Sequence, residues 1–351
     1  MEFIADYGLF LAKIVTVIAG IGIVIGLVTS STKGKSKDKG HLEVTSLNEK
    51  LQIMDDVISE SVLAPHERKT ALKERKKRDK LAAKKPAKKS STKTDSDKEE
   101  KRVFVLNFHG DLRASGVAAL SEEITAVLSQ AKVADEVVVI LESSGGMVHS
   151  YGLGSSQLDR IKKHNIPLTV CVDKVAASGG YMMACVADKL LAAPFAIIGS
   201  IGVVAQIPNI HRLLKRHDVD VELMTAGKYK RTLTVLGENT EEARDKFRED
   251  LDDIHALFKE YVSDRREQLD IEKVATGEIW YGSRAKEIGL VDDIQTSDEY
   301  LTTLAKDCKV FKVHFAEKKT LPEKIGLAAE ETSDRLIFRW LNRLLKPNHY
   351  S

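Results

Sequence analysis

The segment PLTVCVDKVAASGGYMMACVA, residues 167–187, decides the fold of this chain. Its first part, 167–172, is an apolar run that predicts a buried strand, and the part from Tyr181 onward predicts a buried helix. Ser178 and two glycines lie at the junction. A strand–turn–helix junction points free backbone N–H groups and the positive end of the helix dipole at one spot.

Ser178 has two interpretations at this junction. It can simply cap the helix, with the glycines making the turn. Alternatively, its hydroxyl can attack a carbonyl carbon while the N–H of Gly179 stabilises the oxyanion that forms. The segment by itself leaves both interpretations open.

The sequence on either side repeats the strand-then-helix pattern. This alternation predicts an α/β domain with a parallel sheet over residues 103–315. We predict further strands at 103–108, 137–141, 188–193, 201–207 and 219–224, and helices at 115–131, 149–164 and 240–268.

A second glycine turn, Gly145-Gly146, follows the predicted strand 137–141. Turns at the carboxyl ends of neighbouring parallel strands converge on one crevice. The N–H groups of Gly145, Gly146 and Gly179 can therefore face a single point, as in an oxyanion hole with two donors. Two ordinary tight turns are the alternative.

A serine nucleophile also needs a proton acceptor. A histidine is the usual choice, and a lysine can serve where burial in an apolar cleft keeps its amine neutral. The chain offers His149, His164, His211, Lys174, Lys228 and Lys230 as candidates. Their spacing does not choose among them.

The N-terminal segment predicts a membrane anchor. Residues 8–29 carry one charge, Lys13, and are about as long as a helix that spans a bilayer. The start is acidic and no small-residue cleavage site follows, so we expect an uncleaved anchor over 1–30 and not a secretory signal peptide. Lysines gather at 33–39, so the positive-inside rule predicts that the rest of the chain is cytoplasmic, with a periplasmic catalytic domain as the alternative.

Residues 31–102 predict a basic stalk, partly helical and partly disordered. Apolar positions at helical spacing predict a helix at 45–63, and lysine and arginine dominate 68–93. Residues 86–102 hold too few apolar side chains to bury a core. A solvated tether or contact with anionic lipid explains the basic run better than nucleic acid, so we expect no nucleic-acid partner.

The remaining composition predicts no metal or cofactor. The three cysteines, Cys171, Cys185 and Cys308, give neither a disulfide framework nor the spacing of a zinc site. The chain has no phosphate-binding glycine loop and no H-x-x-x-H pair.

Three motifs appear in an order that resembles the signal peptide peptidase A (protease IV) family: VAASGGY at 175–181, GSIGV at 199–203 and GKYK at 227–230. The segment YGLFLAK at 7–13 and the WYG and GLVD motifs within 280–292 extend the resemblance over nearly the whole chain. It implies a bacterial inner-membrane Ser-Lys peptidase with a ClpP/crotonase-like fold of repeated ββα units. A helical tail would then complete the chain at 316–351.

The resemblance also implies roles for individual residues. Ser178 would be the nucleophile, Lys230 the general base, Ser200 the hydrogen-bond partner of the lysine amine, and Gly145, Gly146 and Gly179 the oxyanion donors. The family usually has proline where this chain has Ser144, which should loosen the turn slightly because proline fixes φ. Met147, Val148 and Tyr151 are candidates either for a pocket or for the core.

Members of this family with one catalytic repeat assemble into rings, so the resemblance implies a homo-oligomer whose lysine can come from a neighbouring subunit. Peptides or membrane-associated polypeptides, such as signal-peptide remnants, are the implied substrates. Two alternatives stay open. A crotonase-type acyl-CoA hydratase or isomerase would use carboxylates, of which only Glu142 adjoins a glycine turn. A non-catalytic membrane scaffold would keep the fold alone.

Overall fold

The computed structural model describes residues 16, 40–64, 66–67, 73 and 101–317. The chain divides into two units, Met1–His41 with Glu317–Ser351, and Leu42–Ala316, and the second holds nearly all of the described residues. The predicted anchor, apart from Thr16, and nearly all of the predicted tail lie outside the described residues. Within the described part, no helix has both the length and the apolar composition that crossing a bilayer requires.

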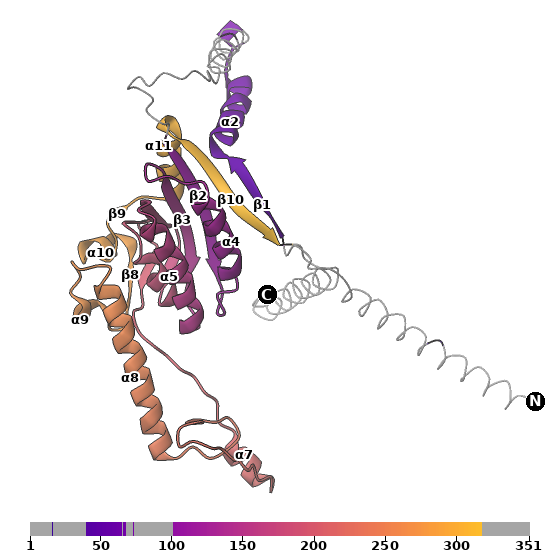
Figure 1. The fold of residues 1–351 in the computed structure, drawn as a ribbon, viewed down its shortest axis with the longest axis vertical. Helices are drawn as coiled ribbons and strands as arrows, with labels where there is room; N and C mark the ends of the chain where they lie inside the picture. The colour runs from indigo at the N-terminus through magenta and orange to yellow at the C-terminus, as the bar shows by residue number, and fades with distance from the viewer. Residues whose placement is uncertain (1–15, 17–39, 65, 68–72, 74–100, 318–351) are drawn as a thin grey trace, which may run out of the picture. The chain divides into compact units, whose positions relative to one another are not determined.

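The second unit is a mixed α/β structure with a largely parallel sheet, as the sequence predicts (Figure 1). The main path of the sheet has the order β1-β10-β2-β3-β4-β6-β9, and every pair from β10 to β9 is parallel. These strands are β1 (Gly40–Ser46), β10 (Lys309–Glu317), β2 (Arg102–Gly110), β3 (Glu136–Ser143), β4 (Leu168–Val172), β6 (Lys189–Ala192) and β9 (Asp293–Ile294).

A short branch leaves the main path at the carboxyl end of β3. Strand β5 (Val175–Ala177) pairs with both β3 and β7 (Ile197–Gly199), and β8 (Ile279–Tyr281) is antiparallel to β7. The helix α6 (Gly179–Ala184) begins directly after β5. This branch therefore carries Ser178 at the end of its first strand.

Both faces of the sheet are covered, and β2 shows why. Phe104, Leu106 and Phe108 belong to one buried cluster, whereas Val103 and Val105 belong to another. Alternate side chains of a strand point to opposite faces, so this run must be apolar throughout. The helices are α2 (Leu47–Val62), α4 (Val117–Leu128), α5 (Val148–Lys163), α6, α7 (His211–Arg216), α8 (Glu241–Ser263), α9 (Ile271–Val274), α10 (Gly282–Glu287) and α11 (Ser297–Asp307).

Two predicted strands are wrong. Residues 201–207 and 219–224 form no strand, and the nearest strand, β7, ends at Gly199. Val204 is 92% exposed, and Val219 and Val221 are exposed too. A strand needs a neighbour for its backbone hydrogen bonds, and the described residues give these two segments none.

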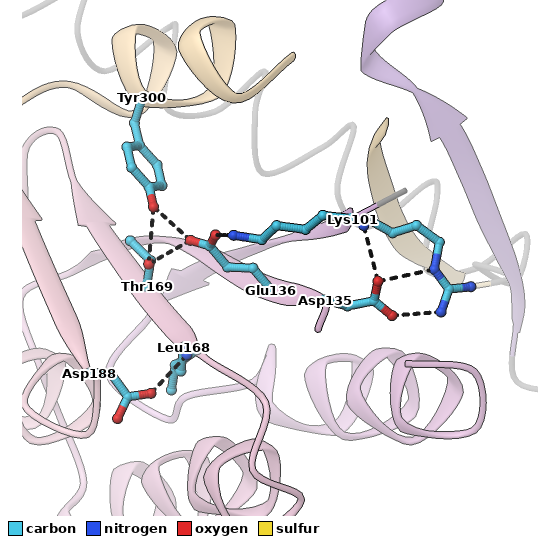
Figure 2. A network of polar contacts seen from close by, with 8 residues as sticks. Lys101, Asp135, Glu136, Leu168, Thr169, Asp188 and Tyr300 are labelled. Atoms are coloured by element: carbon cyan, nitrogen blue, oxygen red, sulfur yellow. Dashed lines mark hydrogen bonds and ion pairs between the residues drawn. The ribbon is translucent and has the colours of Figure 1, made fainter. Parts of the chain in front are cut away.

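A buried polar network joins the amino ends of the strands, at the edge of the sheet away from Ser178. Figure 2 shows the Glu136 carboxylate accepting hydrogen bonds from Lys101 (2.7 Å), Thr169 (2.8 Å) and Tyr300 (2.6 Å). The Glu136 side chain is 5% exposed. Because Tyr300 belongs to α11 and Thr169 to β4, this one carboxylate ties a helix and two strands together.

We expect the Glu136 network to make stability depend on pH. Burial opposes ionisation of Glu136, but the hydrogen bonds from Lys101, Tyr300 and Thr169 outweigh it and hold the pKa below its ordinary value of 4.5. A lowered pKa in the folded state gives stability that is present above the ordinary value and is lost as the pH falls through the acid range. Glu136→Gln should therefore lower the free energy of unfolding by about 1–3 kcal/mol at pH 7.

Urea unfolding of Glu136→Gln and wild type at neutral and acid pH measures this effect. The difference between the two proteins should shrink as the pH falls. Glu122→Gln, at an exposed position of α4, is the control and should match wild type at each pH. A constant difference across the pH range would mean that the charge of Glu136 contributes nothing.

Candidate active site

Ser178 lies in a strained turn between β5 and α6. Its backbone has φ 51° and ψ −120°, in a region that residues other than glycine rarely adopt. Its N–H donates to the carbonyl of Gly199 (2.8 Å), and its own carbonyl accepts from Met182 (2.9 Å). Such strain costs about 1–3 kcal/mol and is concentrated at functional sites, where the surrounding structure enforces it.

Ser200 directly follows the neighbouring strand β7, as Ser178 directly follows β5. The parallel register pairs Ala177 with Gly199, so each serine is the first residue after one of two strands that lie about 4.8 Å apart. Ser200 also has a positive φ, of 50°, and its N–H donates to the carbonyl of Glu278 (2.6 Å). The structure therefore brings these two hydroxyl side chains to the same edge of the sheet.

The turn after β3 packs against the serine turn. Gly145 has φ 91°, and a Cβ atom there would lie 2.8 Å from the carbonyl oxygen of Ala177, the nitrogen of Gly179 and the Cβ of Ser178. Only glycine fits this approach. The two glycine turns that the sequence predicts at one crevice are thus in contact.

The three glycines predicted as oxyanion donors differ in what their N–H groups do. The N–H of Gly145 donates to Ser143 Oγ (3.0 Å), so it is already engaged. In the described part of the chain, the N–H groups of Gly146 and Gly179 have no acceptor. Gly179 is the first residue of α6, where a helix leaves its N–H groups unpaired.

A small pocket opens at these turns. It is lined by Gly146, Val148, Ser178, Gly179, Met182, Gly202, Val203, Ile254 and Phe258. Apart from Ser178 the lining side chains are apolar, and two of them come from α8, which the sequence does not connect with the site. Of the three residues proposed for a pocket, Val148 lines it, Met147 is 41% exposed, and Tyr151 is fully buried beneath the turns.

Lys230 is not part of this pocket. It is exposed. The ring of its neighbour Tyr229 faces Lys246 Nζ on α8 at 5.7 Å. The nearer of the two pocket residues on α8, Ile254, lies eight positions further along the helix, about 12 Å at 1.5 Å per residue. Figure 1 shows α8 leading away from the sheet toward α7. The pocket around Ser178 is therefore formed without Lys230 among its lining residues.

The other candidate bases have partners or open surroundings. Lys228 Nζ forms an ion pair with Glu242 (2.8 Å), and its hydrogen bond to that carboxylate raises the pKa of Lys228, which favours the charged amine. Lys174 Nζ pairs with Glu142 (3.0 Å). His149, His164 and His211 are absent from the pocket lining, and His164 Nδ1 contacts the carbonyl of Arg160 (2.8 Å).

The described part of the chain holds no cluster of metal-ligating side chains. Among the residues that the structure describes, no group of three or more histidine, cysteine, aspartate or glutamate side chains is placed to hold an ion. Cys171 and Cys185 are buried, and burial raises the pKa of both thiols to about 12. They are therefore core residues and not reactive thiolates.

The sequence matches two family models, "Peptidase family S49 N-terminal" over residues 2–158 and "Peptidase family S49" over residues 160–311. "Probable protease SohB" of Haemophilus influenzae is 49% identical over 340 residues, 97% of this chain and 96% of the relative. "Putative protease SohB" of Buchnera aphidicola subsp. Baizongia pistaciae is 42% identical over 351 residues, 98% of this chain and 100% of the relative. A putative protease of Methanocaldococcus jannaschii is 29% identical over 184 residues, 52% of this chain and 58% of the relative.

Proposed function

Because this chain belongs to peptidase family S49, we propose that it is a membrane-anchored serine endopeptidase that uses a Ser-Lys dyad and forms an acyl-enzyme. One observation carries the proposal. The strained Ser178 lies at an apolar pocket, between two glycine turns whose N–H groups at Gly146 and Gly179 have no acceptor among the described residues.

The reaction follows from these positions. Ser178 Oγ attacks the carbonyl carbon of the scissile peptide, and a neutral lysine amine accepts the hydroxyl proton. The oxyanion that forms accepts hydrogen bonds from the N–H groups of Gly146 and Gly179. Collapse of this intermediate expels the amine, which takes the proton from the ammonium, and leaves an ester on Ser178. Water, deprotonated by the same lysine, then hydrolyses the ester.

Lys230 supplies the amine in this proposal, and it comes from a second copy of the chain. Two observations support an intermolecular site: Lys230 is exposed and absent from the pocket lining, and its neighbour Tyr229 contacts α8 at Lys246, eight positions before the pocket residue Ile254. Ser200, beside Ser178, accepts or donates a hydrogen bond at the incoming amine and aims it. Large apolar side chains between β7 and α8, such as Val204 (92% exposed) and Met224 (86% exposed), would be covered by the neighbouring copy.

The substrates in this proposal are peptides or membrane-associated polypeptides, such as signal-peptide remnants. Residues 8–29, which lie outside the described residues, would hold the enzyme on the bacterial inner membrane, with the catalytic unit on the cytoplasmic side by its flanking charges. The apolar lining of the pocket suits small or apolar side chains. The relatives named SohB are described as probable or putative proteases.

The hydratase alternative would need Glu142 as a free acid or base. That carboxylate is paired with Lys174 Nζ at 3.0 and 3.1 Å and does not line the pocket, whereas Ser178 does. No observation favours a scaffold over an enzyme, since the pocket is formed and Ser178 lines it.

A serine-reactive peptidyl phosphonate tests the proposal on the full-length oligomer. We expect one adduct, mapped by peptide mass spectrometry to Ser178, and loss of peptidase activity in step with labelling. Ser156, an exposed serine on α5, should stay unlabelled. Peptidase activity that survives with no adduct on Ser178 would contradict the assignment. Hydration of an enoyl-CoA without labelling would point to the crotonase reaction.

A further inference from the structure

A chain of hydrogen bonds runs beneath both glycine turns of the site. Gly145 N–H donates to Ser143 Oγ (3.0 Å), Ser143 Oγ lies 2.6 Å from Tyr151 Oη, and Tyr151 Oη donates to the carbonyl oxygen of Asp111 (2.7 Å). Ser143 is 1% exposed and Tyr151 is fully buried. Water therefore cannot replace these bonds easily, and each lost partner leaves a buried polar group unpaired.

The direction of every proton in this chain is fixed. The Asp111 carbonyl can only accept, so the Tyr151 hydroxyl donates its one hydrogen bond to it. Tyr151 Oη then accepts from the Ser143 hydroxyl, whose oxygen in turn accepts from Gly145 N–H. Burial raises the pKa of Tyr151, more than the Ser143 hydrogen bond lowers it, so the phenol keeps the proton that it donates.

The same two residues pack against the serine turn. A Cβ atom on Gly179 would lie 2.5 Å from Tyr151 Cγ, and one on Gly180 would lie 2.4 Å from the carbonyl oxygen of Ser143. The Tyr151 ring is therefore in direct contact with the residue whose N–H adjoins Ser178. One buried pair supports the backbone on both sides of the pocket.

We propose that Ser143 and Tyr151 are positioning residues that align the two oxyanion donors of this protease. Ser143 holds the N–H of Gly145, which leaves the N–H of Gly146 as the donor that this turn presents to the pocket. The Tyr151 hydroxyl fixes the Ser143 side chain by a hydrogen bond, and the Tyr151 ring fixes the position of Gly179 by direct contact. This inference rests on the proposed function, because it requires that an oxyanion forms beside Ser178 during the reaction.

Tyr151→Phe keeps the ring and removes the bond to Asp111, whereas Ser143→Ala removes the acceptor of Gly145. Each should lower kcat about 10- to 100-fold and leave KM nearly unchanged. An oxyanion donor displaced by a fraction of an ångström weakens its hydrogen bond to the transition state more than it weakens binding of the substrate. A peptide boronate, which forms a tetrahedral adduct, should bind more weakly by the same factor. A peptide substrate should still bind normally when either change is combined with Ser178→Ala.

Tyr181→Phe is the matched control. Tyr181 is also fully buried, and its Oη also donates to a backbone carbonyl, that of Leu290 (2.8 Å), away from both turns. Tyr181→Phe loses the same kind of hydrogen bond as Tyr151→Phe. It should keep the wild-type kcat, even if its thermal unfolding temperature falls as far as that of Tyr151→Phe.

Several results would overturn the inference. One is a kcat for Tyr151→Phe and Ser143→Ala equal to that of Tyr181→Phe, and another is an equal loss of boronate and substrate binding. If Tyr151→Phe does not fold, Ser143→Ala decides alone. Activity that survives in Ser178→Ala would refute the proposed function itself. An inactive Ser178→Ala beside fully active Ser143→Ala would refute only the positioning role.

Discussion

Ser178→Ala is expected to abolish peptidase activity and to leave the fold intact. Loss of the nucleophile removes the acyl-enzyme route, which in serine proteases costs a factor on the order of 10⁴ to 10⁶ in kcat. Alanine keeps the Cβ atom and meets the same strain at φ 51°, so the turn has no reason to change. A fluorogenic peptide assay measures the loss, and thermal unfolding checks the fold.

The control for this variant is Ser156→Ala, an exposed serine to alanine change on α5 that should keep full activity. Activity of Ser178→Ala above about one per cent of wild type, after subtraction of the uncatalysed rate, would count against the assignment.

Lys230→Ala is expected to be nearly inactive alone and to regain activity when mixed with Ser178→Ala. In a site shared between two copies, an interface works when a chain with intact Ser178 meets a chain with intact Lys230. Random exchange of equal amounts in a closed head-to-tail assembly gives this arrangement at about a quarter of the sites. The mixture should therefore reach about a quarter of the wild-type activity.

Subunit exchange must be verified in the same samples, for example by energy transfer between labelled chains. Mixing Lys230→Ala with the double variant Ser178→Ala/Lys230→Ala is the control, and it should restore nothing because no lysine is available. If exchange is complete and the first mixture also stays inactive, the site is not shared. Lys228→Ala should keep more activity than Lys230→Ala, since its amine is paired with Glu242.

Long apolar runs made the centre of the fold predictable. The runs at 103–108 and 137–141 appear as β2 and β3, because a strand covered on both faces must be apolar at every position. The junction at Ser178 and its contact with the Gly145 turn also follow from the sequence, since parallel strands bring their carboxyl ends together. The helix predicted at 45–63 appears as α2, with Ser46 accepting from the N–H of Glu49.

The short strands carried no such signal. Strands β5, β7 and β8 have three residues each, too few for any periodicity, and they exist because their neighbours supply the hydrogen bonds. Strand β1 was likewise not predicted. Asn48, which follows it, bonds Val310 N–H and the carbonyls of Ala305 and Cys308 across more than 250 residues. No local pattern can reveal contacts of that kind.

The geometry of the candidate site was predictable where it depends on neighbouring residues and not where it depends on residues distant in the sequence. The positive φ of Ser178 and Ser200 fits glycine-flanked turns, whereas the approach of α8 to the pocket depends on the packing of Phe258 and Ile254. Ser143 and Tyr151 had a partial signal, since one precedes a glycine turn and the other lies on the helix after it. Only the structure shows that their hydroxyl groups meet.

The distance along α8 between the Tyr229–Lys230 segment and the pocket bears on how a cell restrains such an enzyme. On the shared-site proposal, a newly made chain carries parts of two catalytic centres and the whole of neither. It needs no pro-segment to keep it harmless, because encounter with a sister chain is the activating event. Specific activity should then collapse on dilution. If the predicted anchor at 1–30 holds the chains in a membrane, their density within the membrane plane, more than their total number, would set the rate of proteolysis.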